Sequence, residues 1–167
     1  MQNNLWVELV DLSEEIAKEI YDWRQDPITL ASSCHSMPQA WENFWEEFRY
    51  QYFQLRELSL AVVRSAEKRV AYVRFRPCSL YKESSFVRTR EISILVCPSM
   101  RGRGYGYQTL LRAEKLALEN GIHRLVAYIR PENEASKELF RKAGYGFIGQ
   151  QEGIAAHAVV LLVPSND

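Results

Sequence analysis

The chain has 167 residues, 47% of them hydrophobic, so it is long and apolar enough for a single domain with one buried core. Its 21 basic and 21 acidic residues cancel, which excludes a global field that would gather nucleic acid or an anionic membrane. The three cysteines, Cys34, Cys78 and Cys97, are an odd number without C-x-x-C spacing, which argues against a disulfide framework and a zinc site. We therefore expect a cytoplasmic protein without a metal.

A strand and a helix are predicted at the start of the chain. Residues 5–10 suit a strand, and Asp11-x-x-Glu14 is a capping-box sequence that opens a helix to about residue 23. Asp26-Pro27 ends this helix, because proline disfavours the helical conformation of the residue before it. Residues 28–37 are expected to form a loop.

A second helix is predicted after this loop. Ser36-x-x-Gln39 is another capping-box sequence, and the helix that it opens runs to about residue 55. Aromatic side chains recur on one face of this helix, at Trp41, Phe44, Trp45, Phe48 and Tyr52. Such a face packs into the core or lines a pocket for a sugar or base ring.

The rest of the chain alternates between strand and helix patterns. Residues 58–64 and 69–76 suit an antiparallel hairpin over the polar loop 65–68, and residues 87–96 suit a longer strand. The later predicted elements are a helix at 107–120, a strand at 125–129, a helix at 133–143 and strands at 145–149 and 154–163. The longest apolar stretch, near residues 158–163, is too short to span a bilayer, so no membrane partner is expected.

A glycine-rich turn, Arg-Gly-Arg-Gly-Tyr-Gly at residues 101–106, joins the long strand to the following helix. Glycines at alternate positions leave the backbone uncovered by Cβ atoms, so N–H groups can face an oxyanion while the helix adds its positive end. The turn lacks the third glycine of G-x-G-x-x-G, and the chain has no P-loop sequence. Its R-x-x-G-x-G pattern, Arg101, Gly104 and Gly106 after a strand ending in Val96-Cys97-Pro98, resembles the pyrophosphate-binding signature of the GNAT superfamily of acetyl-CoA-dependent N-acetyltransferases. An ordinary strand-to-helix turn is the alternative.

The predicted element order, β-α-α-β-β-β-α-β-α-β-β, is also the order of the GNAT fold. The resemblance implies an α+β (mixed α/β) fold in a single domain over residues 1–167. Its twisted, mostly antiparallel sheet would carry helices on both faces. The parallel strands 91–96 and 125–129 would splay apart, leaving room for the pantetheine arm of the cofactor.

The same resemblance implies acetyl-CoA as the co-substrate and assigns residues to it. Leu95 and Val96 would contact the pantetheine arm. The pyrophosphate would bind the main-chain amides of the turn, at Arg101, Gly102, Arg103, Gly104, Tyr105 and Gly106. The side chains of Arg101 and Arg103 could add charge-assisted hydrogen bonds to phosphate oxygens.

A second family element is found in residues 130–145, an Asn after a strand followed by a short helix that ends in Gly-Tyr. Asn133 resembles the Asn that bonds the pantetheine arm, and Ser136 the small polar residue that faces the cofactor. Asn133 suits an ordinary helix N-cap equally well. Phe140 departs from the pattern, because many members have a Tyr there that protonates the leaving thiolate, and a phenyl ring has no proton to give.

Phe140 could still pack beside the thioester, and Tyr128 and Tyr145 are candidates to replace the missing acid or to pack in the core. Glu91 is the candidate general base, because GNAT members often place a carboxylate on this strand to take the amine proton directly or through water. The alternative for Glu91 is a solvated carboxylate paired with Arg88 or Arg90. His157 interrupts an apolar strand and could face the acceptor or be a core or edge histidine.

The acceptor is less defined by the sequence. Residues 23–27, Trp-Arg-Gln-Asp-Pro, are similar to the W-R-x-D-P segment of GNAT branches that acetylate nucleotide-linked amino sugars or ribosomal-protein N-termini, and a packed helix end is the alternative. Three functions stay open: an acetyltransferase for a small primary amine such as an amino sugar, one for a protein N-terminus or lysine, and a non-catalytic coenzyme A sensor. The expected partners are acetyl-CoA and an amine, with a homodimer as the candidate assembly.

Overall fold

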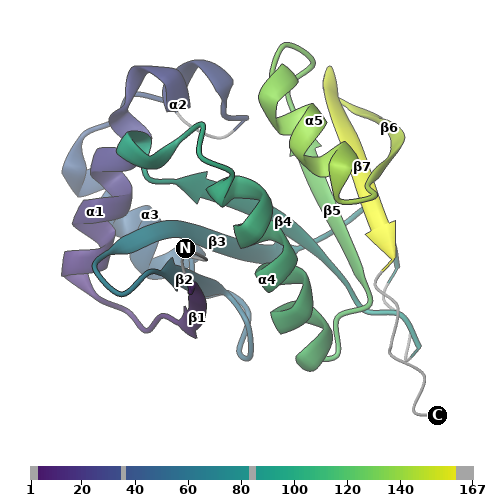
Figure 1. Cartoon of the computed structure of the whole chain (residues 1–167), viewed down its shortest axis with the longest axis horizontal. Helices are drawn as coiled ribbons and strands as arrows, with labels where there is room; N and C mark the ends of the chain where they lie inside the picture. The colour runs from purple at the N-terminus through teal and green to yellow at the C-terminus, as the bar shows by residue number, and fades with distance from the viewer. Residues whose placement is uncertain (1–3, 35–36, 83–85, 161–167) are drawn as a thin grey trace.

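The computed structural model describes residues 4–34, 37–82 and 86–160, which form a seven-stranded sheet with helices on both faces (Figure 1). The strand order is β1-β2-β3-β4-β5-β7-β6, and neighbours are antiparallel except β4 and β5. The strands are β1 (Trp6–Leu9), β2 (Leu60–Arg64), β3 (Arg69–Pro77), β4 (Thr89–Val96), β5 (Arg124–Ile129), β6 (Gly146–Gln151) and β7 (Ile154–Val160). The helices are α1 (Glu14–Gln25), α2 (Pro27–Ser32), α3 (Trp41–Gln51), α4 (Tyr105–Glu119) and α5 (Glu134–Lys142), with a 3₁₀ turn at Pro98–Met100.

Two apolar clusters cover the two faces of the sheet. On one face, α4 packs Leu110 and Ala113 against alternate residues of β2 and β3 such as Val63 and Val73. On the other face, α1 and α3 pack against Leu60, Val62 and Tyr72. Phe44 and Phe48 of α3 are fully buried in this second cluster, so the aromatic face of the helix is part of the core. Burying each of these rings contributes roughly 2 kcal/mol.

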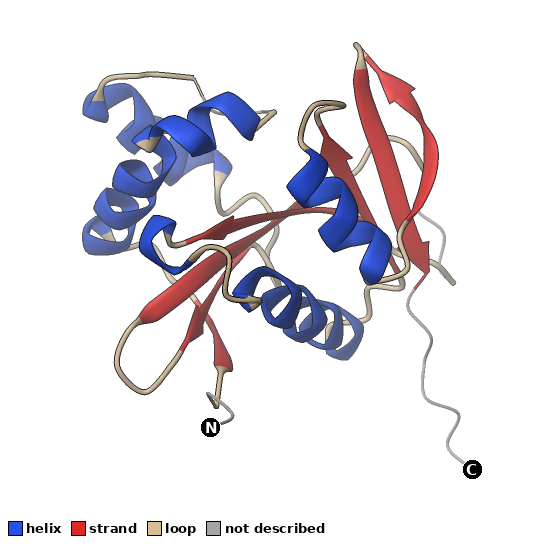
Figure 2. Cartoon of the chain, turned by 45° about the horizontal axis from the view of Figure 1, so that its top comes forward, coloured by secondary structure: helices blue, strands red, loops and turns tan. Residues whose placement is uncertain are grey.

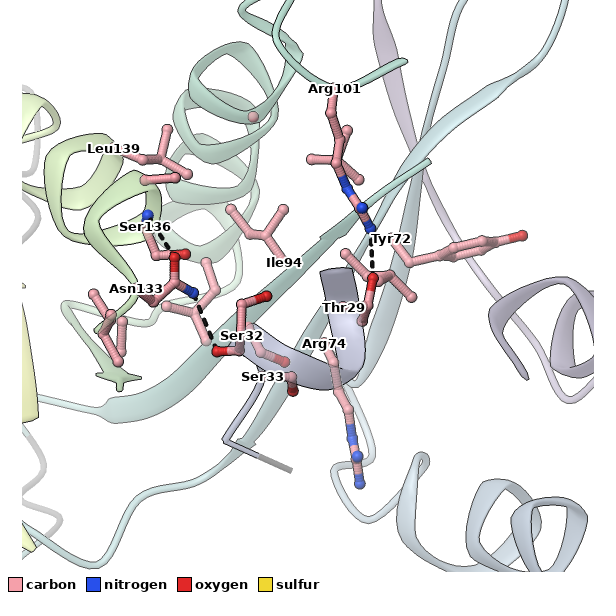
Figure 3. A pocket seen from close by; sticks show the side chains of 18 of the residues that line it. Thr29, Ser32, Ser33, Tyr72, Arg74, Ile94, Arg101, Asn133, Ser136 and Leu139 are labelled. Atoms are coloured by element: carbon pink, nitrogen blue, oxygen red, sulfur yellow. Dashed lines mark hydrogen bonds between the residues drawn. The ribbon is translucent and has the colours of Figure 1, made fainter. Parts of the chain in front are cut away.

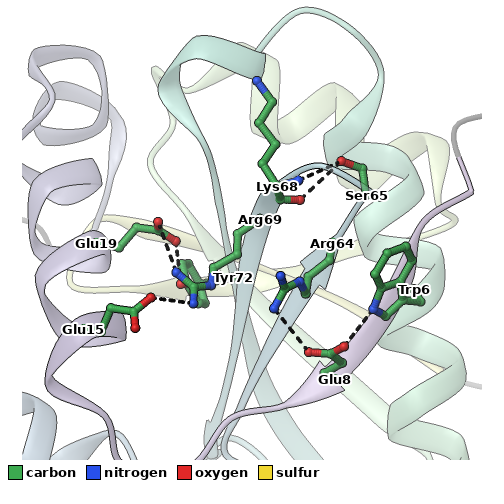
Figure 4. A network of polar contacts seen from close by, with 9 residues as sticks. All are labelled: Trp6, Glu8, Glu15, Glu19, Arg64, Ser65, Lys68, Arg69 and Tyr72. Atoms are coloured by element: carbon green, nitrogen blue, oxygen red, sulfur yellow. Dashed lines mark hydrogen bonds and ion pairs between the residues drawn. The ribbon is translucent and has the colours of Figure 1, made fainter.

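Polar contacts also fasten α1 to the sheet (Figure 4). Arg69 of β3 pairs with Glu15 at 2.7 Å and with Glu19 at 3.5 Å. The Tyr72 hydroxyl donates to Glu19 at 2.6 Å, and burial raises the pKa of Tyr72 above its usual value. The hydroxyl therefore stays protonated and serves as a structural donor.

The N-terminal elements differ from the prediction in three details. The cap of α1 is Ser13, whose hydroxyl accepts from the Ile16 amide, rather than Asp11. Residues 28–32, expected in a loop, form α2 together with Pro27, because the Asp26 side chain caps the Thr29 amide and Pro27 occupies the first helical turn, where its missing N–H costs nothing. The predicted cap Ser36 lies outside the described residues, and α3 begins after Ala40 without a side-chain cap and ends at Gln51.

The parallel strands β4 and β5 separate after a short paired stretch, as the fold implies. Their register pairs Thr89 with Arg124, Arg90 with Leu125 and Glu91 with Val126. Beyond Glu91, both strands continue without pairing to each other, and the two parts of the sheet diverge (Figure 2). The gap leaves main-chain groups of β4 available to a ligand. Within the described residues, no helix is both long and apolar enough to cross a bilayer.

Candidate active site

A cavity of about 510 Å³ occupies the gap between β4 and β5. One wall is the open part of β4, and another is the glycine turn with the first residues of α4. The start of α5 and the whole length of α2 close two further sides, and β3 supplies the floor. The cavity therefore joins the predicted pyrophosphate turn to a compartment between α2 and β3.

The glycine turn has the open conformation that an anion cradle requires. Gly102 and Gly104 have φ of +73° and +78°, a left-handed conformation that side chains rarely adopt, and a Cβ on either would meet no atom within 4 Å. Gly104 is the N-cap of α4, so the first-turn amides and the positive end of a 15-residue helix face this space. At Gly106 a Cβ would lie 3.4 Å from Leu139, so glycine there permits close packing of α4 on α5.

Most predicted cofactor residues line this one cavity. They are Leu95, Val96, Arg101, Gly102, Gly104, Tyr105, Gly106, Asn133, Ser136 and Phe140. Arg103 and Glu91 are not among the lining residues. Arg103 is exposed to solvent. The contacts of these residues with a cofactor stay predictions.

The Arg101 side chain is directed to α2 (Figure 3). Its Nη1 donates to Asp26 Oδ2 at 2.7 Å, and its Nη2 donates to the Thr29 hydroxyl. The Arg101 guanidinium, followed by the backbone amide of Thr29, holds the pKa of the Asp26 carboxyl below its usual value. The carboxylate is thus charged and engaged at neutral pH.

Asn133 is the N-cap of α5, as one of its two interpretations predicted. Its Oδ1 accepts from the Ser136 amide at 3.1 Å. Its Nδ2 donates to the Ser32 carbonyl at 3.2 Å, so the same side chain also reaches the end of α2. Its contact with the pantetheine arm stays a prediction.

The three aromatic residues considered for proton donation have different positions. Phe140 lines the cavity and packs edge-on against Tyr145, with ring centroids 4.9 Å apart. Tyr145 is buried behind it, outside the cavity lining, and burial raises its pKa. Tyr128 lines the cavity, and desolvation, with Cys78 nearby, raises its pKa to about 12. Tyr128 is therefore a neutral donor at physiological pH, on the wall of the cavity itself.

Glu91 lies at the point where β4 leaves β5, and its side chain is 13% exposed. The carboxylate forms an ion pair with Arg76 on β3, a partner that the sequence analysis did not consider. Arg88, one of the two predicted partners, pairs with Glu57. The next residues along the strand, Ile92 and Ser93, line the cavity, so Glu91 borders it from behind.

His157 is outside the cavity lining. Its ring packs against Phe147 of β6, and its buried Nε2 has no hydrogen-bond partner among the described residues. Burial lowers the pKa of His157, with Lys137 adding to the effect. His157 thus packs within the sheet, on β7 between β5 and β6, and does not face the cavity.

Sequence reasoning missed the arginines at the floor of the cavity. Tyr72, Arg74 and Arg76 all line it, because side chains two residues apart in β3 share a face. Arg74 lies over the ring of Tyr52 at 3.7 Å, and burial lowers its pKa. The alternation of arginines within a β-rich run was the signal that could have found them.

Among the described residues, three arginines at this end of the cavity, Arg24, Arg74 and Arg76, form ion pairs with two carboxylates. Arg24 and Arg74 share the carboxylate of Glu47, at 3.0 and 3.7 Å, and Arg76 pairs with Glu91. The Nε atoms of Arg74 and Arg76 are buried and have no hydrogen-bond partner within the described part of the chain. This end of the cavity thus has positive charge that suits an anionic group.

Comparisons with known proteins agree with this geometry. A family model described as an acetyltransferase (GNAT) domain matches residues 7–146. A Bacillus subtilis protein provisionally assigned as a phosphinothricin acetyltransferase is 35% identical over 77 residues, which are 46% of this chain and 47% of the relative. The L-methionine sulfoximine/L-methionine sulfone acetyltransferase of Pseudomonas aeruginosa is 30% identical over 128 residues, 77% of this chain and 66% of the relative.

The matched regions thus span about half to two thirds of the length of these curated relatives. Among solved structures, the spermidine N-acetyltransferase of Vibrio cholerae in complex with CoA and spermine superimposes with a TM-score of 0.74. It is 14% identical, and the alignment covers 94% of this chain and 95% of that one. At this identity the likeness shows the fold alone.

Proposed function

Because the chain belongs to the GNAT acetyltransferase family, we propose that it transfers the acetyl group of acetyl-CoA to the primary amine of a small amino acid with a free carboxylate. The observation that supports this acceptor class is the pair of half-buried arginines, Arg74 and Arg76, in the same cavity as the glycine turn. A carboxylate pairs well with guanidinium groups. An amino sugar or a polyamine has no such group. The named substrates of the Pseudomonas relative, derivatives of an amino acid, support the same class.

The cofactor end of the cavity suits acetyl-CoA. The open cradle at Gly102 and Gly104 would hold the pyrophosphate on main-chain amides. The pantetheine arm would lie along Leu95 and Val96, where β4 has no neighbour on the β5 side. Ser136 and Phe140 would face the arm and the thioester from α5.

Acetyl transfer requires a neutral amine, and an amine with a pKa of about 10.4 costs about 4 to 5 kcal/mol to deprotonate at pH 7. Glu91 would accept this proton through a water molecule, because the carboxylate lies behind the lining residues. The amine nitrogen then bonds to the acetyl carbon, and the carbon–sulfur bond breaks to release the thiolate. A main-chain N–H near Val96 would stabilise the oxyanion, and Tyr128, which lines the cavity, would protonate the thiolate.

The proposal is tested by measuring thiol release from acetyl-CoA with a panel of amines. The panel contains L-methionine sulfoximine, its carboxamide derivative, glucosamine, spermidine and a short peptide. We expect turnover with L-methionine sulfoximine and at least a tenfold higher KM for the carboxamide, about the loss of one charge-assisted hydrogen bond. A preference for glucosamine, spermidine or the peptide would assign another acceptor class. Binding of CoA without thiol release from any amine would support the sensor.

A matched pair of variants locates the carboxylate site. Arg74→Met should raise the KM for L-methionine sulfoximine about tenfold and leave the KM for acetyl-CoA unchanged. Arg49→Met is the control, since Arg49 also stacks on aromatic rings, those of Trp45 and Tyr50, but lies outside the cavity lining. An equal effect of the two substitutions would contradict the assignment.

A further inference from the structure

Helix α2 has only six residues and is held at both ends by side chains from distant parts of the chain. An isolated helix of this length is not stable in water, because too few hydrogen bonds form to offset the cost of nucleation. Its position therefore depends on its tertiary contacts. Two of these contacts come from residues that the family resemblance assigns to the cofactor, Arg101 and Asn133 (Figure 3).

The N-terminal end of α2 is fixed to the glycine turn. Asp26 caps the helix by accepting from the Thr29 amide at 3.1 Å, and the same oxygen accepts from Arg101 at 2.7 Å. The second terminal nitrogen of Arg101 donates to the Thr29 hydroxyl. Both terminal nitrogens of Arg101 thus contact α2, and the side chain is largely shielded, with 27% exposed. A phosphate group would have to compete with a charged carboxylate for this guanidinium.

The C-terminal end of α2 is fixed to α5. The carbonyl of Ser32, one of the last-turn carbonyls that have no partner within a helix, accepts from Asn133 at 3.2 Å. The other half of the same amide caps α5. Asn133 therefore joins two helix ends whose residues are 101 positions apart in the chain.

Between these two attachments α2 forms a wall of the cavity. Ile28, Thr29 and Ser32 line the main cavity. Ile28 and Ser32 also line a second open groove on the outer side, between α2 and the β5–α5 connection. Displacement of α2 would therefore merge the cavity with this groove and remove one side of the compartment that holds the acceptor.

We infer that Arg101 and Asn133 act in this chain as positioning residues, which hold α2 as the wall of the acceptor compartment rather than binding the cofactor through their side chains. The inference rests on the proposed function for what the compartment binds. The main-chain amide of Arg101 keeps its predicted place in the pyrophosphate cradle.

Hydrogen exchange of the α2 amides tests the attachment without any acceptor. In Arg101→Gln and in Asp26→Asn, exchange of residues 29–33 should become about ten- to a hundredfold faster, the range of one charge-assisted hydrogen bond. The matched control is Arg103→Gln, on the same turn, which should leave α2 exchange unchanged. Unchanged exchange in Arg101→Gln would overturn the inference, whether or not an amine of the panel is acetylated.

Kinetics and calorimetry separate positioning from cofactor binding. Arg101→Gln should raise the KM for L-methionine sulfoximine about five- to tenfold while CoA binding, measured by calorimetry, changes less than twofold. Arg103→Gln should show the reverse pattern, with weaker CoA binding. The double variant Asp26→Asn/Arg101→Gln should have no higher KM for L-methionine sulfoximine than Arg101→Gln alone, since both substitutions remove the same interaction. Weaker CoA binding in Arg101→Gln than in Arg103→Gln would show that the Arg101 side chain binds a phosphate group instead.

Asn133→Ser isolates the second attachment. A serine keeps an oxygen for the α5 cap, but it has no amide group to reach the Ser32 carbonyl. We expect faster exchange at Ser33 and a higher KM for L-methionine sulfoximine, with unchanged exchange at the start of α5 and unchanged CoA affinity. A loss of CoA affinity with α2 exchange intact would identify Asn133 as a pantetheine ligand and refute its positioning role.

Discussion

At the scale of single residues, the role of a side chain depends on the groups that it contacts. Glu91 and Asp26 are both carboxylates beside a guanidinium, yet Asp26 is an N-cap fixed to the glycine turn, whereas Glu91 stands where two strands part. Glu91 pairs with Arg76, whose side chain lines the cavity. The residue type alone does not distinguish these roles.

Glu91→Gln tests the base at this scale. Glutamine preserves the size and one acceptor oxygen but cannot take a proton, so turnover should fall roughly a hundredfold or more while CoA affinity stays unchanged. The measurement is kcat/KM from pH 5 to 9, and full activity of Glu91→Gln over that range would refute the assignment.

Tyr128→Phe tests the donor that could replace the acid missing at Phe140. Because the pKa of Tyr128 is raised to about 12, its hydroxyl remains protonated over the working range of pH. The variant should be slower by roughly tenfold, a small general-acid effect, since a thiolate leaves readily even without an acid. Tyr145→Phe, a buried tyrosine outside the cavity lining, is the control. Equal rates for Tyr128→Phe and wild type would show that no acid acts here.

At the scale of elements, the start of α4 depends on one left-handed glycine. Gly104→Ala should cost about 1 kcal/mol of stability, because alanine is strained at φ of +78°. It should also weaken CoA binding about tenfold by covering and shifting the cradle amides. Gly144→Ala, at φ of +90° in equally open space after α5, is the matched control. It should lose similar stability and keep its CoA affinity.

Glu114 on α4 predicts a pH dependence of stability. Desolvation raises the pKa of its carboxyl, an effect that the nearby Tyr145 hydroxyl only partly offsets. The folded state then holds the proton more tightly than the unfolded state, so the free energy of unfolding falls as pH rises from about 4 through the raised pKa. Glu114→Gln should therefore raise Tm at pH 7.5 and not at pH 4. Glu119→Gln, on the exposed face of α4, should change Tm little at either pH.

At the scale of the whole molecule, three residue pairs between β4 and β5 connect two parts of the sheet, β1–β4 and β5–β7. A ligand in the gap would contact both parts. At a concentration of CoA one hundred times its Kd, we expect a stabilisation of about 2.7 kcal/mol and a Tm increase of roughly 5 to 10 °C. Thermal unfolding with and without CoA measures the shift in Tm. Hydrogen exchange with CoA should show protected amides in both β4 and β5. Protection confined to residues 101–106 would contradict binding in the gap.

Assembly as a homodimer and the single-domain boundary at residues 1–167 stay predictions at this scale. Size-exclusion chromatography with light scattering measures the first directly.

Apart from α2, the order of the elements could be predicted from the sequence, as could the hairpin over residues 65–68 and the glycine turn, because each depends on local periodicity or on a backbone conformation that only glycine adopts readily. The pair Asp26-Pro27 was predicted only to end α1, although Asp followed by Pro is equally typical of the start of a helix. Tertiary structure alone decided that Arg101 meets Asp26, 75 positions away, and that Asn133 meets Ser32. These contacts depend on how the helices and strands pack around the cavity. The local sequence around each residue does not predict them.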